Sequence, residues 1–149
     1  MRIAIAGDHA GFTLKKNVEP WIISLGHEVK HLGAFSMDPN DDYPDFALLV
    51  AKEISSGKAD KGIIICGSGV GACITANKVK GVRAAICHDI YSSHQGVEHD
   101  DMNVLCLGSR VINQDLAKKI IESFLNSKFS YDDRHVRRLQ KVMDIEGQN

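Results

Sequence analysis

The residues from Cys66 to Gly71 read Cys-Gly-Ser-Gly-Val-Gly and follow a short apolar run at 62–66. A glycine-rich turn between a strand and a helix lets backbone amides converge on an anion, and the helix dipole adds to the attraction. A thiol at such a helix start is favoured as thiolate, so Cys66 could act as a base or a nucleophile. Without further support, the same features also describe a tight turn and a buried structural cysteine.

Two other uses of this turn are disfavoured by its spacing. A thiol phosphatase needs an arginine at position 72 to hold phosphate on the cysteine's own loop, and this chain has Ala72 there. A dinucleotide site needs its third glycine in a different place, so the pattern G-x-G-x-G does not match that fingerprint. The turn therefore predicts an oxyanion or phosphate cradle.

Further polar residues stand where predicted strands end. Asp8 and His9 follow the first strand, and Arg110 follows the last one. In an open parallel sheet, ligands bind beyond the carboxyl ends of the strands, so we expect these side chains to meet Cys66 at one edge.

The last predicted helix carries Arg134 and Arg138, which lie four residues apart and therefore on one face. Two guanidinium groups on one face suit a phosphate dianion, although a solvated basic stripe balanced by nearby aspartates has the same pattern. His99, which is flanked by carboxylates, is typical of a surface histidine, and Tyr43 is typical of loop packing.

The elements that must position these residues alternate along the chain. Apolar runs predict strands, and apolar residues at helical spacing predict helices. We expect strands at 3–6, 27–32, 62–66, 82–87 and 103–107, and helices at 12–25, 45–54, 70–78, near Ser92, 115–125 and 133–145. Because strands that are apolar throughout alternate with helices, the fold class is α/β: a three-layer α/β/α Rossmann-like fold with a five-stranded parallel sheet and a C-terminal helix.

Two helices carry more specific expectations. Pro20 lacks an amide donor and should bend or break the first helix. In the second helix, Asp45 could be the cap. Its inner face is predicted to contain Phe46, Leu49, Val50 and Ile54.

Bulk composition narrows the function classes. The 149 residues are 44% hydrophobic and 25% charged, which is the balance of one folded domain over residues 1–149. A net charge of -1 gives no general attraction for nucleic acid or an anionic membrane. No apolar run approaches the length of a membrane helix, and no signal peptide or anchor is visible. We therefore expect no nucleic-acid or membrane partner and a cytoplasmic location.

The four cysteines contain no C-x-x-C pair and lie in apolar segments: Cys66, Cys73, Cys87 and Cys106. This usage favours reduced thiols over a disulfide framework or a zinc site, so no metal is expected.

Taken together, these residues resemble one family along essentially the whole chain: the type B ribose-5-phosphate isomerases, with their relatives the allose- and galactose-6-phosphate isomerases. The specific matches are Gly7 to Phe12, Asp42 to Pro44, Ile65 to Gly71, Ala76 to Lys78, Gly81 to Ala84, Asn103-Val104, Gly108 to Arg110, and Arg134-His135 with Arg138. The resemblance implies an aldose-ketose isomerase of the non-oxidative pentose phosphate pathway that interconverts ribose 5-phosphate and ribulose 5-phosphate through an enediolate, without a cofactor.

The resemblance also implies roles for single residues. Cys66 matches the base that takes the proton from C2, and the enediolate oxygen would be held by the turn residues Gly67, Ser68, Gly69, Val70 and Gly71. The Ser68 hydroxyl would move protons between O1 and O2, and His99, helped by Asp8, would open the furanose ring. The phosphate grip would contain His9, Arg110, Arg134 and Arg138, and Tyr43 would line the pocket. The family's assembly implies a homodimer, or a dimer of dimers, with active sites shared between chains.

Two positions depart from the family pattern. Asp100 stands where asparagine is usual, and a carboxylate there would repel an enediolate unless it is protonated, turned away or paired. Ser68 stands where threonine is common, which keeps the hydroxyl and changes only the pocket width. Two alternatives stay open: an isomerase for a six-carbon sugar phosphate, and a non-catalytic module that binds sugar phosphates. The presence of Cys66, Ser68 and His99 speaks against the second, because binding alone needs no base.

Overall fold

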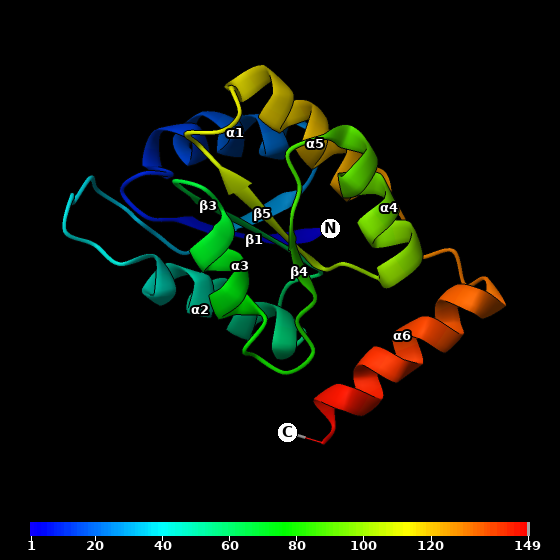
Figure 1. The fold of residues 1–149 in the computed structure, drawn as a ribbon. Coiled ribbons are helices and arrows are strands. Elements are labelled where there is room, and N and C mark those ends of the chain that lie inside the picture. The colour runs from blue at the N-terminus through cyan, green and yellow to red at the C-terminus, as the bar shows by residue number, and fades with distance from the viewer. Residues whose placement is uncertain (149) are drawn as a thin grey trace.

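The computed structural model describes residues 1–148, in which a parallel sheet is covered by helices on both faces (Figure 1). The sheet order is β2-β1-β3-β5-β4. The strands are β1 (Arg2–Gly7), β2 (Glu28–His31), β3 (Lys61–Cys66), β4 (Ala84–Ile86) and β5 (Val104–Gly108). The predicted three-layer α/β/α fold with five parallel strands is therefore confirmed, and β4 is shorter than the run from which it was predicted.

The central strands are apolar along their whole length because each face of the sheet meets a helix layer. One face packs on α1 (Phe12–Ser24), α4 (Ile90–Asp100) and α5 (Gln114–Asn126), and the other packs on α2 (Tyr43–Ser55) and α3 (Val70–Ala76). Successive side chains of a strand point to opposite faces. Ile63 and Ile65 thus enter the first layer, whereas Ile64 and Cys66 enter the second.

Four details of the helices differ from the predictions. Helix α1 runs without a break through Pro20, whose position is exposed, so the lost amide bond falls on the solvent side. The cap position of α2 is Asp42, and Asp45 lies inside the first turn. Leu49 is 43% exposed, and the buried face of α2 is instead formed by Ala47, Val50, Ala51 and Ile54. The helix predicted near Ser92 is longer than expected and contains His99.

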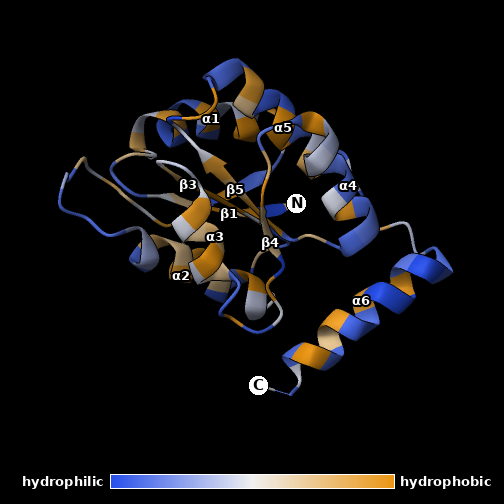
Figure 2. Cartoon of the chain, viewed as in Figure 1, coloured by the Kyte–Doolittle hydropathy of each residue, from blue (hydrophilic) through white to orange (hydrophobic). Residues whose placement is uncertain are grey.

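Helix α6 (Asp133–Glu146) lies apart from the layers and approaches the rest of the chain mainly at α4 (Figure 1). His135 is its only buried residue in the described part of the chain. Apolar residues recur along the helix (Figure 2). Val142 and Ile145 are among the exposed ones, the latter to 62%. Among the described residues, no helix has both the length and the apolar character required to span a membrane.

Candidate active site at the carboxyl edge of the sheet

The candidate site lies where β1, β3 and β5 end side by side. Pairing puts Gly7 beside Ile65 and Cys66 beside Gly108, so the segments that follow these strands leave the sheet together. A cleft of about 310 Å³ opens there. It is lined by Asp8, His9, Ala10, Tyr43, Cys66, Gly67, Ser68, Gly71, Arg110 and Val111. The structure therefore gathers most residues that were predicted from the ends of strands.

The glycine turn holds the thiol at the wall of this cleft. Gly69 adopts the left-handed conformation, with φ of 83°, and its N–H donates to Cys66 Sγ at 3.0 Å. The N–H of Val70 donates to Ser68 Oγ at 3.3 Å. Cys66 is 4% exposed, so its sulfur is shielded from bulk water and still borders the cleft. The Gly69 amide thus fixes the position of the sulfur at the cleft wall.

Arg110 and Tyr43 close the turn from two sides. The Arg110 guanidinium lies over Gly67, 3.4 Å from the position that a Cβ would occupy there, and the Arg110 N–H donates to the Gly67 carbonyl at 3.0 Å. The ring of Tyr43 lies so close to Gly71 that a Cβ there would be 2.5 Å from Tyr43 Cζ. A Cβ at Gly71 would therefore have to displace the Tyr43 ring, whereas one at Gly67 would make ordinary contact with Arg110.

Asp8 and His9 are fixed by separate partners. The Asp8 carboxylate accepts the N–H of Gly11 at 2.9 Å and is almost fully buried. His9 is held by Asp41, which accepts the backbone N–H at 2.9 Å and lies 2.7 Å from Nδ1. The hydrogen bond to Asp41 raises the pKa of His9 above its usual value, and the charge of Asp8 adds to the effect. Sequence reasoning missed Asp41, because it lies in an aperiodic loop with several other acidic residues.

Asp8, His9 and Asp41 bring one metal-type ligand atom each to within 4.8 Å of one another. Their hydrogen bonds account for this closeness, since Nδ1 of His9 pairs with Asp41 and Asp8 pairs with the Gly11 amide. We therefore describe them as a hydrogen-bonded cluster, and the expectation that the protein needs no metal stays a prediction.

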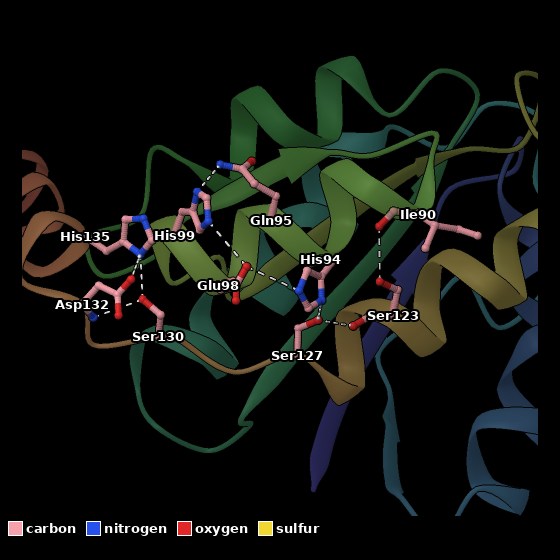
Figure 3. A network of polar contacts seen from close by, with 10 residues as sticks. All are labelled: Ile90, His94, Gln95, Glu98, His99, Ser123, Ser127, Ser130, Asp132 and His135. Atoms are coloured by element: carbon pink, nitrogen blue, oxygen red, sulfur yellow. Dashed lines mark hydrogen bonds and ion pairs between the residues drawn. The ribbon is translucent and has the colours of Figure 1, made fainter.

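The remaining predicted residues do not line the cleft of their own chain. His99 lies in the last turn of α4, where its Nδ1 is 3.0 Å from Gln95 Nε2 and its ring stacks on His135 at 4.0 Å between centroids (Figure 3). His135 in turn contacts Ser130 Oγ through Nδ1 at 2.6 Å, and burial lowers its pKa. This network joins α4 to the start of α6.

Asp100 and Arg138 line a second cleft of about 500 Å³ between α6, α4 and the β4 edge of the sheet. Arg134 extends from the first turn of α6 and is exposed. The structure thus separates the predicted phosphate grip into a group beside Cys66 and a group on α6. Gly69 and Val70 belong to the turn but do not line the Cys66 cleft.

Comparison with known proteins decides the family. The chain matches the Ribose/Galactose Isomerase family over residues 3–142. It belongs to that family. Ribose-5-phosphate isomerase B of Escherichia coli strain K12 is 40% identical over 145 residues, covering 97% of this chain and 96% of that protein. The D-erythrulose-4-phosphate isomerase of Pectobacterium atrosepticum is 42% identical over 132 residues, or 87% of this chain and 85% of its own.

Solved structures of this isomerase family have the same fold. Ribose-5-phosphate isomerase B from Mycoplasma genitalium, crystallised with bound ribulose 5-phosphate, superposes with a TM-score of 0.95 at 43% identity, covering 99% of this chain and 97% of the other. The resemblance seen in the ordered motifs is therefore confirmed at the level of the family and the fold. The roles of single residues stay predictions.

Proposed function

We propose that this member of the ribose/galactose isomerase family interconverts ribose 5-phosphate and ribulose 5-phosphate in the pentose phosphate pathway. The observation that carries the proposal is a shielded cysteine that receives an amide hydrogen bond at the wall of a cleft, with the Arg110 guanidinium over the adjoining Gly67. Proton transfer next to a carbonyl needs a base, donors for the developing oxyanion and an anchor that positions the carbon.

In this mechanism the Cys66 thiolate takes the C2 proton of the open-chain aldose, and the C–H electron pair forms the C1–C2 double bond of the enediolate. The same proton or one from water returns to C1, while Ser68 transfers a proton from O2 to O1. The amides of Gly69 and Val70 are engaged with Cys66 and Ser68. We therefore assign the enediolate oxygen to the amides of Gly67, Ser68 and Gly71.

We further propose that the working unit is a homodimer in which α6 of one chain completes the cleft of the other. Arg134, Arg138 and His99 lie outside the cleft of their own chain, and α6 leaves an apolar stripe exposed. A second chain that covers this stripe would remove it from water and would bring the two arginines toward a bound phosphate. We also place this reaction in the cytoplasm.

The first test is an assay of the purified protein with EDTA present. We expect conversion of ribose 5-phosphate, with a lower kcat/KM for allose 6-phosphate and for D-erythrulose 4-phosphate. Cys66→Ala should abolish turnover while inorganic phosphate still binds. Full activity of this variant would remove Cys66 from the mechanism, and a preference for the four- or six-carbon phosphate would reassign the substrate.

The shared site can be tested by mixing two defective variants. Cys66→Ala and Arg138→Ala each damage every site of a homodimer, whereas a mixed dimer has one site with both changes and one intact site. Random reassembly of equal amounts should restore roughly a quarter of the wild-type activity at low substrate concentration. Activity no higher than the average of the two parents would show that Cys66 and Arg138 serve the same chain.

A further inference from the structure

Asp41 makes the contacts expected of a residue that controls another side chain. It lies in the loop before α2, and its side chain is only 10% exposed. The single oxygen Oδ1 accepts both the backbone N–H of His9, at 2.9 Å, and the ring Nδ1–H, at 2.7 Å. Two hydrogen bonds from one carboxylate oxygen fix both the backbone and the ring of His9.

This geometry determines which nitrogen of His9 can meet a ligand. With Nδ1–H directed at Asp41, Nε2 is the nitrogen left for the cleft, which His9 lines together with Arg110. The 31% exposure of the His9 side chain leaves room for such a contact. An imidazole held by a carboxylate retains its second proton more readily, and in that form Nε2–H donates to an anion.

We propose that Asp41 is a positioning residue that holds His9 as an imidazolium whose Nε2–H binds the phosphate of the substrate. The inference rests on the proposed function for the identity of the sugar phosphate. Asp41 itself does not touch the substrate.

The charges around His9 agree with this assignment. The titratable and charged groups of the same cluster and cleft are Asp8, Asp41, Tyr43, Cys66 and Arg110. The two carboxylates favour a cation at His9, and their contribution exceeds the cost of its partial burial, since the pKa of His9 is raised. Arg110 would share the phosphate charge from the other side of the cleft.

The second oxygen of Asp41 argues that this carboxylate is not present for stability alone. Oδ2 is buried and has no hydrogen-bond partner among residues 1–148. A buried anionic oxygen without a partner is a cost in the folded state. This cost is explained if the negative charge of Asp41 acts on a neighbouring group, and that neighbour is His9.

Asp41→Asn tests the charge while keeping the shape, because the amide oxygen can still accept both hydrogen bonds. We expect the KM for ribose 5-phosphate to rise on the order of tenfold near neutral pH with kcat nearly unchanged. We also expect the pH above which KM rises to be lower than in the wild type. Asp38→Asn is the matched control, because it removes the same charge from the same loop, and the hydrogen bonds of Asp38 are to the backbone N–H groups of Asn40 and Asp41, which asparagine can still accept. It should behave as wild type.

A titration of the histidine rings by NMR separates this inference from the proposed function. The His9 signal, assigned with a His9→Gln variant, should lose its proton at a lower pH in Asp41→Asn than in the wild type. Inorganic phosphate should protect that proton in the wild type. These readouts hold even if the wild type fails to isomerise ribose 5-phosphate, which would refute the proposed function alone. An unchanged His9 titration, an unchanged KM, a loss confined to kcat or an equal effect of Asp38→Asn would each overturn the role of Asp41.

Discussion

Two glycines of the site face different kinds of neighbour, and alanine substitutions should separate their effects. At Gly11 a Cβ would lie 1.9 Å from the Ile65 carbonyl oxygen and 2.4 Å from its carbon. Its φ of -84° suits any residue, so the effect of Gly11→Ala is purely steric. Real Cβ atoms keep at least 3.0 Å from such neighbours, which means that α1 and β3 must separate by about 1 Å.

This separation destabilises the fold strongly, because the groups in contact belong to the backbone and not to a flexible side chain. Gly11 is the N-cap of α1, and Ile65 is paired with β1 and β5 through the sheet. Overpacking a fixed contact costs about 1–3 kcal/mol, and we place Gly11→Ala at the upper end. For a chain of this size that loss lowers Tm by roughly 6–12 °C.

Gly71→Ala should give the opposite profile. The nearest atoms to its Cβ are in the ring of Tyr43, at 2.5–3.0 Å, and that side chain is 40% exposed and can move into solvent. Alanine also favours the helix over glycine by about 1 kcal/mol, so the free energy of unfolding should stay near that of the wild type. The displaced Tyr43 changes the cleft wall, so KM should rise severalfold.

Thermal and urea unfolding of both variants, together with kcat and KM, check these expectations. A Gly11→Ala variant with the Tm of the wild type would show that α1 and β3 can part freely. A Gly71→Ala variant that is the less stable of the two would show that the Tyr43 ring is held as firmly as backbone. Either result would refute the reasoning from neighbours.

Three further predictions concern individual side chains: an arginine of α6, two cysteines and a buried lysine. Arg138→Ala should mainly raise KM, whereas Arg137→Ala, on another face of α6, should not; equal effects would exclude a specific phosphate contact. Iodoacetamide should label Cys73 near neutral pH and leave Cys87 untouched, because the hydrogen bond with Cys106 lowers the pKa of Cys73 to about 7, whereas burial raises that of Cys87 to about 11; mass spectrometry of the peptides checks this. Burial lowers the pKa of Lys61 to about 8, so between that pH and its unfolded pKa the unfolded chain binds more protons, and the free energy of unfolding should rise with pH. Solvent screening keeps the slope below the limit of about 1.4 kcal/mol per pH unit. In Lys61→Met the rise should be smaller, and the part that remains is expected from Lys15, whose pKa burial also lowers.

The fold was accessible from the sequence because burial on both faces leaves a clear pattern. Strand β3 is apolar from Gly62 to Cys66, and such a run between helices predicts a central parallel strand. The predictions were wrong where the apolar pattern does not determine which face of a helix a residue occupies. Leu49 repeats at helical spacing with Val50, but the helix turns it outward. Pro20 does not break α1, because it falls on the exposed side.

The candidate site was only partly accessible, for a related reason. The rule that ligands bind at the carboxyl ends of strands predicts Asp8, Cys66 and Arg110, because strand ends can be read from local sequence. No local pattern fixes where a long loop returns, so the contact of Asp41 with His9, 32 residues away, had no signal of its own. The position of α6 depends on tertiary contacts and, in our proposal, on a second chain.

This difference in predictability parallels a division of labour in the cleft. Cys66 ends a strand that is paired on both sides, so a change in its position requires three strands to move. Asp41 lies in the loop before α2, and Tyr43 is the first residue of that helix. Residues in this segment can change without disturbing the sheet. The names of the family and of its relatives include sugars of different lengths. In the proposed mechanism the base is fixed by the sheet, whereas Tyr43 forms part of the cleft wall from outside the sheet. We therefore expect a change of Tyr43 to alter which sugar length is accepted while the proton transfer at Cys66 stays the same.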